Sequence, residues 1–217
     1  MSLHILREVL ITYLGLIVLL TFHEVGHAWM AWRCGDDTAK RAGRVSLNPI
    51  VHLDLIGTVL IPLTMLILSS YHSAAAGFLI GWAKPVPVDP SKLRHPRLDD
   101  VLISMAGPAM NVILAVILAG LARVLLNLEL PGMSPVLKQF ALISLLLCFF
   151  NLIPIPPLDG SHVLRVLIGM SRETYARIAS FGFVIVILVL QIPQVRQGLD
   201  HVTRTTYRAI LGWFGLF

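Results

Sequence analysis

The sequence predicts an all-α polytopic membrane protein with about five to six transmembrane helices. Of the 217 residues, 56% are hydrophobic and only 13% are charged, whereas soluble domains carry about 25% charged residues. A water-soluble globule of this size could not cover its surface with so few charges, so that class is excluded. Backbone amides cannot stay unpaired in lipid, and helices are therefore the expected spanning elements. The basic residues behind the net charge of +5 are expected to lie against anionic lipid, and no nucleic-acid partner is predicted.

Five apolar runs locate the predicted spans. In the first run, between Glu8 and Arg33, the only formal charge is Glu24. The other four runs carry no formal charge: residues 55–83, 101–122, 139–158 and 178–195. Each is near or above the roughly 20 residues that a helix needs to cross hydrocarbon.

Basic residues gather in two of the predicted loops. One loop follows the first span, and the other precedes the third run. Their members are Arg33, Lys40, Arg41 and Arg44 in the first, and Lys84, Lys92, Arg94 and Arg97 in the second. The positive-inside rule places both loops in the cytoplasm and the amino terminus outside.

The run over residues 55–83 is too long for one span. We expect a second span to about Ser70, followed by a re-entrant segment near residues 77–90 that returns as an extended hairpin through Trp82 to Val88. Non-helical backbone at that depth must be shielded by protein or line a wet cavity. A Pro-rich interfacial linker is an equally good interpretation of the same residues.

The last third of the chain contains a helix-breaking segment. Three prolines between Asn151 and Asp159 interrupt any helix there. A short helix is expected from Gly160 to about Gly169, and a further span from about Tyr175 to Ile192. Residues 194–217 alternate arginines with apolar residues, which suits an amphipathic interfacial tail after a single membrane domain over 1–193. The side of the membrane on which this tail lies is left open.

A metal-binding pattern lies inside the first span. Residues 23–27 read His-Glu-Val-Gly-His, and positions four apart share one helix face, so that His23 and His27 can reach one metal ion with Glu24 beside its water. Zinc suits such a site because it accepts nitrogen and oxygen ligands tetrahedrally. Ionisable residues within a membrane helix indicate function, although a polar cluster that joins helices is the alternative.

Asp159 is the best candidate for a third ligand, because it follows the proline-broken segment and closes a charge-free stretch. Its alternative role is the N-cap of the helix that starts at Gly160. His162 is either a partner of a ligand or a plain interfacial histidine. His52 and Asp54 precede the next span, where helix capping and a supporting role near the metal both remain open.

Four motifs in this order resemble those of the site-2 protease family of intramembrane zinc metalloproteases. They are His23 to His27, Asn48-Pro49 with His52 to Asp54, Gly107 to Asn111 (GPAMN) and Asn151 to Gly160 (NLIPIPPLDG). The resemblance runs from about residue 10 to 170. Without a PDZ or CBS domain, the chain is similar to the compact branch of the family.

The resemblance implies roles for individual residues. His23, His27 and Asp159 would bind one Zn2+ per chain, Glu24 would be the general base that acts on zinc-activated water, and Asn151 would position the substrate or its oxyanion. Asn111, His52 and Asp54 would support the site. The substrate-binding strand would contain Trp82, Lys84, Pro85, Val86 and Pro87.

The function implied is cleavage of transmembrane segments of membrane proteins, that is, regulated intramembrane proteolysis. The partners would be a transmembrane protein substrate and the lipid bilayer. The location would be a prokaryotic cytoplasmic membrane, with the active site near the cytoplasmic face. A membrane zinc transporter and a non-catalytic membrane chaperone remain alternatives.

Overall fold

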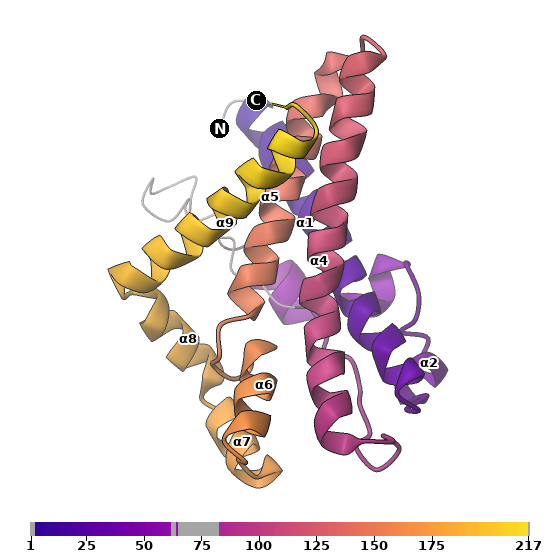
Figure 1. Ribbon diagram of the computed structural model, residues 1–217, viewed down its shortest axis with the longest axis vertical. Helices are drawn as coiled ribbons and strands as arrows, with labels where there is room; N and C mark the ends of the chain where they lie inside the picture. Colours follow the sequence, from indigo (N-terminus) through magenta and orange to yellow (C-terminus); the bar gives the residue numbers. More distant parts are fainter. Residues whose placement is uncertain (1–2, 62–63, 65–82, 217) are drawn as a thin grey trace.

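The computed structural model describes residues 3–61, 64 and 83–216, and this part of the chain is helical without any β-strand (Figure 1). The α-helices, with the labels of Figure 1, are α1 (Leu3–Arg33), α2 (Thr38–Arg41), α4 (Pro96–Asn127), α5 (Ser134–Asn151), α6 (Gly160–Leu167), α7 (Arg172–Ala179), α8 (Gly182–Leu190) and α9 (Pro193–Trp213). Shorter 3₁₀ or π-helical turns cover Pro49–His52, Leu55–Leu60 and Pro131–Met133. The predicted all-α class is confirmed for the described residues.

Three helices in the described part of the chain are long and apolar enough to cross a membrane. They span Arg7–Arg33, Pro96–Asn127 and Pro131–Asn151. A fourth crossing is possible if α7 and α8, which meet at an angle of 62°, form one broken span. Helix α4 packs against both α1 and α5, and α1 passes behind them in the view of Figure 1.

The outward faces of these helices are apolar. On α4, Ile113, Ile117 and Leu121 are each about half exposed, at a spacing that repeats every helical turn, and Leu10 and Leu14 do the same on α1. Monomeric soluble proteins rarely present such continuous apolar stripes to water. The chain is therefore an integral membrane protein whose helices meet hydrocarbon along these faces.

Small residues fill the contact between α4 and α5. Ala115, Ala119 and Ala122 of α4 are fully buried, as is Leu145 of α5 opposite them. Helices in lipid associate mainly through close packing, which small side chains allow. This dense seam holds α4 and α5 as one rigid unit beside the helix that carries the histidines.

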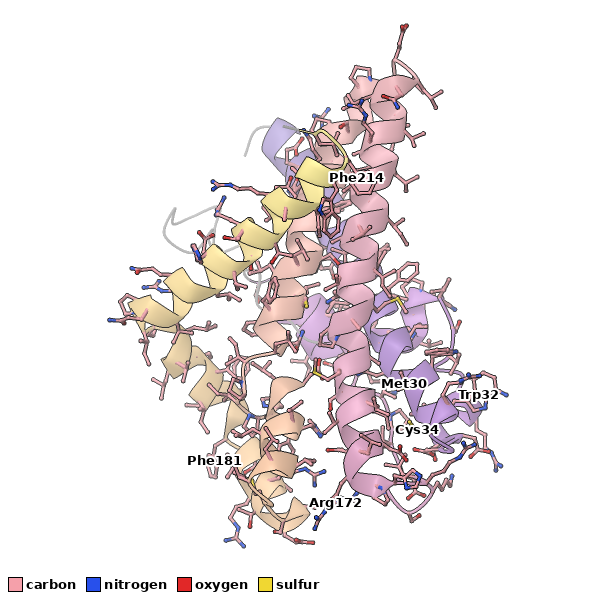
Figure 2. The ribbon with its side chains drawn as sticks, viewed as in Figure 1. Met30, Trp32, Cys34, Arg172, Phe181 and Phe214 are labelled. Carbon is pink, nitrogen blue, oxygen red and sulfur yellow. The ribbon has the colours of Figure 1, made fainter. Side chains whose placement is uncertain are left out.

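The carboxyl-terminal third wraps back over this unit. Helix α6 begins at Gly160, where the sequence predicts a helix start, and packs against α4. Helix α9 crosses α5, and its Ile210 and Leu211 join the core, while Phe214 just beyond it lies near α4 (Figure 2). The predicted helix after residue 193 is thus present; the boundary between domain and tail at residues 193/194 stays a prediction.

For residues 55–83, the structure describes only the two ends of the run, so the prediction for its middle is untested. The second span to Ser70 and the re-entrant turn through Gly77, Gly81 and Trp82 lie outside the described residues. Beyond them the chain continues without helix from Ala83 to Asp89. Exposure alternates from Pro85 to Val88, with the prolines outward, as in an extended chain.

Candidate metal centre

Three ligand residues predicted from the sequence come together between α1 and the start of α6. His23 and His27 lie one turn apart on the buried face of α1, and Asp159 reaches them from the loop that follows α5. The two histidines are 4% and 8% exposed. A residue 132 positions further along the chain than His27 therefore completes the cluster.

The ligand atoms form a nearly equilateral triangle. His23 Nε2 lies 3.0 Å from His27 Nε2, and Asp159 Oδ2 lies 3.2 Å and 3.4 Å from these two nitrogens. Ligands of tetrahedral zinc at about 2.0–2.2 Å are separated by about 3.3–3.6 Å. Asp159 Oδ2 is buried without a hydrogen-bond partner among the described residues. An unpaired buried carboxylate oxygen beside two imidazole nitrogens fits a metal ligand, so the residues present fit zinc.

The outer nitrogen of each imidazole meets a group on α4. His27 Nδ1 lies 2.7 Å from the carbonyl oxygen of Ile103, to which it donates its proton, and Nε2 is then free to bind metal. His23 Nδ1 faces the side-chain amide of the fully buried Asn111 at 3.1 Å. Turning that amide over would bring Oδ1, which has no partner in the described part of the chain, to the His23 proton.

Two glycines allow α1 and α4 to approach closely at the cluster. A Cβ atom on Gly107 would lie 2.6 Å from His27 Cε1 and 2.7 Å from His23 Cε1, and one on Gly26 would lie 2.7 Å from the Ala106 carbonyl oxygen. Neither position has room for any side chain. Gly26 of the HEVGH motif therefore faces α4, and Gly107 of the GPAMN motif faces α1. Together they set how close the imidazoles lie to α4.

The loop from Leu152 to Asp159 returns to its own start, because Gly160 lies against the backbone of Leu152 and Ile153. A Cβ atom there would lie 2.5 Å from the Leu152 carbonyl carbon and 3.0 Å from the Ile153 carbonyl oxygen. Asp159 does not cap α6 with its side chain. Asp159 thus occupies the N-cap position of α6 without capping it through its side chain, and its carboxylate faces the histidines instead.

The two residues predicted to act on the substrate are not members of the ligand cluster. Glu24 is half-buried on α1 between the histidines and forms no hydrogen bond or salt bridge within the described ranges. Asn151 ends α5, and its amide donates to the Leu147 carbonyl oxygen at 3.0 Å. Their catalytic roles stay predictions.

His162 binds a residue that the sequence analysis missed. Its Nδ1 lies 3.2 Å from Asp100 Oδ1, and Arg165 donates to Asp100 Oδ2 at 2.6 Å. His162 thus belongs to an ion-pair cluster between α4 and α6, outside the set of three ligands. The spacing of His162 and Arg165, three residues apart in a helix with a polar side, was the only indication in the sequence.

His52 and Asp54 have structural partners of their own. Asp54 Oδ1 accepts hydrogen bonds from the backbone N–H groups of Ile56 and Gly57 at 3.1 Å and 2.7 Å, which makes it a helix cap. His52 is buried, and its Nε2 lies 2.8 Å from the Ser46 carbonyl oxygen. Neither residue joins the ligand cluster; any further support of the site stays a prediction.

Of the predicted substrate-binding residues, Trp82 lies outside the described residues. Lys84 to Pro87 form the first part of the extended segment, and its backbone is joined to the loop after α2 through a hydrogen bond from Lys84 N–H to the His52 carbonyl oxygen at 2.9 Å. Contact with substrate stays a prediction for all of these residues.

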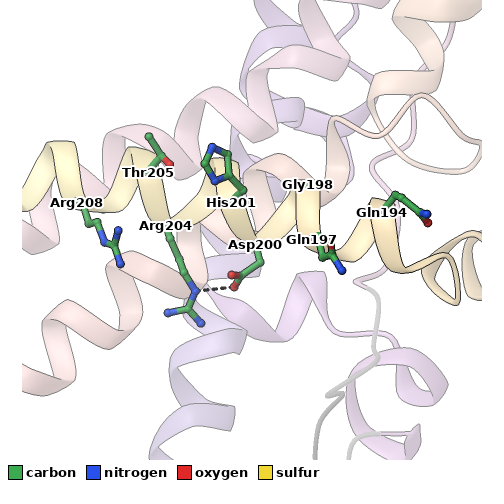
Figure 3. A pocket seen from close by; sticks show the side chains of 8 residues that line it. All are labelled: Gln194, Gln197, Gly198, Asp200, His201, Arg204, Thr205 and Arg208. Carbon is green, nitrogen blue, oxygen red and sulfur yellow. Dashed lines mark hydrogen bonds and ion pairs between the residues drawn. The ribbon is translucent and has the colours of Figure 1, made fainter.

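A separate hollow lies along α9, far along the chain from the ligands (Figure 3). All the residues that line it belong to that one helix, and Arg204 is paired there with Asp200 at 2.6 Å. It contains none of the predicted site residues. A hollow lined by a single helix does not enclose a ligand.

A buried His-His-Asp cluster in a bundle of apolar helices, with a carboxylate between the two histidines, defines a membrane metalloprotein of the metallopeptidase type. The chain belongs to peptidase family M50, the site-2 protease family, whose family model matches residues 11–131 and 127–192. The resemblance seen in the four motifs is thereby confirmed.

Individual relatives agree with this membership. A Bacillus subtilis protein named "Putative zinc metalloprotease YwhC" is 38% identical over 186 residues, which cover 82% of this chain and 78% of that protein. A Mycolicibacterium smegmatis protein named "Putative zinc metalloprotease Rip2" is 28% identical over 191 residues, covering 84% of this chain and 67% of that protein. No solved structure matches the chain.

Proposed function

We propose that this protein is a zinc-dependent intramembrane endopeptidase that cleaves transmembrane segments of membrane proteins, with one zinc ion per chain. The observation that carries the proposal is the ligand triangle of His23, His27 and Asp159, whose edges of 3.0–3.4 Å suit one tetrahedral metal ion. Family membership supports the same chemistry.

The chain's own residues supply a base and a polar donor for hydrolysis. When bound, zinc supplies a Lewis acid that polarises a carbonyl and lowers the pKa of its water. Glu24 lies next to a ligand in sequence and is not engaged by another described side chain, so it is available to take a proton and to return it to the leaving amine. Asn151 is the candidate donor to the developing oxyanion, a contact whose loss costs about 3–4 kcal/mol in other enzymes.

The extended segment from Ala83 to Asp89 is the candidate substrate-presenting element. A peptide bond inside a helix is shielded by its own hydrogen bonds, so the substrate must unwind locally before it is cut. An extended backbone that keeps some main-chain groups unpaired, as Val86 does among the described residues, can hold such a peptide by adding it as a strand. Lys84, Pro85, Val86 and Pro87 are proposed to contact it.

The depth of the site supports access from the cytoplasmic side of a prokaryotic membrane. Trp29 and Trp32 follow His27 on α1 and are about 40% exposed, and Arg33 and Lys40 stack on their rings at 5.6 Å and 3.8 Å. Aromatic and basic residues gather at membrane–water interfaces. At 1.5 Å per residue, Trp32 lies about 7–8 Å along the helix from His27, so the ligands would sit just inside the hydrocarbon.

Glu24→Gln is the decisive variant. With the ligands intact, it is expected to keep its zinc but to lose at least about a thousandfold in cleavage of a single-span membrane substrate reconstituted in vesicles, because the base is gone. Zinc content is measured by elemental analysis and cleavage by mass spectrometry of the products. The candidate substrates are the membrane proteins that accumulate in a Glu24→Gln strain.

Cleavage by Glu24→Gln at the wild-type rate would refute the proposed protease function. Zinc flux into sealed vesicles would then identify a transporter. Equal retention of uncleaved clients by both proteins would identify a chaperone. Neither alternative needs a carboxylate at position 24.

A further inference from the structure

We propose that Arg44 is a positioning residue that sets the register in which the extended segment Ala83–Asp89 meets the substrate. The inference rests on the proposed function and names a residue through which its substrate element acts. Arg44 lies in the loop after α2, and its side chain forms no hydrogen bond or ion pair with the described residues of the ligand cluster.

Arg44 joins two loops that are distant in the sequence. Its side chain is buried, with 4% of the residue exposed. The guanidinium donates from Nη1 to the Val51 carbonyl oxygen at 2.8 Å and from Nη2 to the Lys84 carbonyl oxygen. The Lys84 N–H donates to the His52 carbonyl oxygen at 2.9 Å. Both main-chain polar groups of Lys84 are therefore held, one of them by Arg44.

The other end of the segment is tied to the helix that carries the ligands. Asp36, fully buried just after α1, accepts a hydrogen bond from the Asp89 N–H at 2.6 Å through Oδ2. Val88 packs against the cluster that contains Ala31 and Cys34 at the end of α1. The segment is thus stretched between Asp36 and Arg44, and its position follows that of α1.

Between these anchors, Val86 and Val88 are the described residues that keep a main-chain donor free on the edge that Lys84 begins. In an extended chain, successive residues direct their N–H and C=O groups to opposite edges. Pro85 and Pro87 have no N–H, so their edge offers acceptors alone. Val86 lies on the same edge as Lys84, and its main-chain groups form no hydrogen bond within the part of the chain that the structure describes.

This pattern makes register critical. A slip of one residue would replace Val86 by a proline, which cannot donate to an incoming strand. The hydrogen bond from Arg44 to Lys84, two residues before Val86, opposes that slip. An arginine fork can hold two carbonyl groups in fixed directions, whereas a lysine provides a single point charge.

The position of Arg44 also relates the segment to the catalytic carboxylate. Burial lowers the pKa of Arg44, and the negative charge of Glu24 raises it. The segment is tied through Asp36 and Val88 to α1, the helix that carries Glu24, so a shift of the segment relative to α1 changes which peptide bond meets the base.

The test compares Arg44→Gln and Arg44→Lys with Arg41→Gln, which removes a charge three residues away whose side chain is 77% exposed. For both Arg44 variants we expect wild-type zinc content, a fall of about tenfold or more in kcat/KM, and products cut at several neighbouring peptide bonds. Arg41→Gln should cut at the wild-type bond with wild-type kcat/KM.

A second measurement does not depend on activity. Amide hydrogen exchange of the zinc-loaded protein in nanodiscs should be faster over residues 84–89 in Arg44→Gln, and unchanged over α1. Unchanged exchange, a single wild-type cleavage site, or loss of zinc from the Arg44 variants would each overturn the proposal. If the proposed protease function itself is wrong, wild type and Glu24→Gln would give the same products. Hydrogen exchange would still show in that case whether Arg44 anchors the segment.

Discussion

At the scale of single residues, the metal centre depends on two glycines, which have no side chain to separate α1 from α4. Gly107 faces both ligand histidines, and Gly26 faces the backbone of α4. Interiors are packed as closely as crystals, so a methyl group has nowhere to go at either position. The distance between α1 and α4 at the ligands is set by these two glycines.

Gly107→Ala is therefore expected to weaken zinc binding by about 5- to 150-fold, since overpacking costs about 1–3 kcal/mol and would push the two imidazoles from the metal. Competition with a chelator of known affinity measures the effect. Gly198→Ala is the matched control, because a Cβ atom at Gly198 meets nothing within 4 Å in α9. Equal zinc affinity in Gly107→Ala and wild type would show that α4 yields to the added methyl group.

The sequence indicated which residues would cluster as candidate ligands better than it indicated their surroundings. His23, His27 and Asp159 stand out because ionisable residues are rare inside apolar runs. Asp100 and Arg44 do not, because each lies beside other charged residues in a loop or at a helix start, where charge is expected. Only the fold shows that the side chains of these two residues turn inward.

At the scale of elements, α6 is fixed to α4 by the charges that the sequence analysis missed. Arg165 is 8% exposed, and its guanidinium meets the Asp100 carboxylate at 2.6 Å. Tyr175 of α7 lies on the same cluster, with its hydroxyl 2.9 Å from Ser161 Oγ. Since α6 begins directly after Asp159, this cluster also fixes the third ligand.

Arg165→Met is expected to lower the midpoint of thermal unfolding in detergent by about 3–12 °C, because a partly buried carboxylate loses a charged hydrogen bond worth about 1.5–3 kcal/mol. Arg172→Met, at an exposed arginine on α7, is the control and should change the midpoint little. The double variant Asp100→Asn/Arg165→Met should be less destabilised than the sum of the single variants. Additive losses would mean that the two side chains do not act as a pair.

Helix boundaries were predictable where the chain contains breakers. The prolines after Asn151 and the glycine at 160 mark the end of α5 and the start of α6, as the structure has them. One further span was expected from about Tyr175 to Ile192, whereas the chain there forms two helices, α7 and α8, with a bend of 62° between them. The absence of charged residues does not indicate the direction of a helix axis, so the bend at Phe181 could not be predicted from it.

At the scale of the whole molecule, the candidate metal site joins residues that are far apart in the chain. His23 and His27 belong to the first helix, and Asp159 belongs to the loop after α5. A ligand that binds only the folded state stabilises it by mass action, by about 2.7 kcal/mol at a hundred times its dissociation constant. Zinc is therefore expected to stabilise the bundle as well as to serve the reaction.

Removal of zinc should lower the unfolding midpoint by about 5–11 °C, and added zinc should restore it. Differential scanning fluorimetry in detergent, with and without a chelator, measures this shift. Asp159→Ala lacks one ligand and should show a smaller shift, which separates binding at this site from adventitious binding. The same shift in both proteins would place the stabilising metal elsewhere.

The distance in sequence between the ligands also has a consequence for biogenesis. His27 leaves the ribosome 132 residues before Asp159, which at about 5–20 residues per second takes about 7–26 s. During that interval α1 is already made while its third ligand is not. If Asp159 is the third ligand, zinc can be held by all three residues only after the chain has been synthesised as far as residue 159, so the proposed activity would be absent until then.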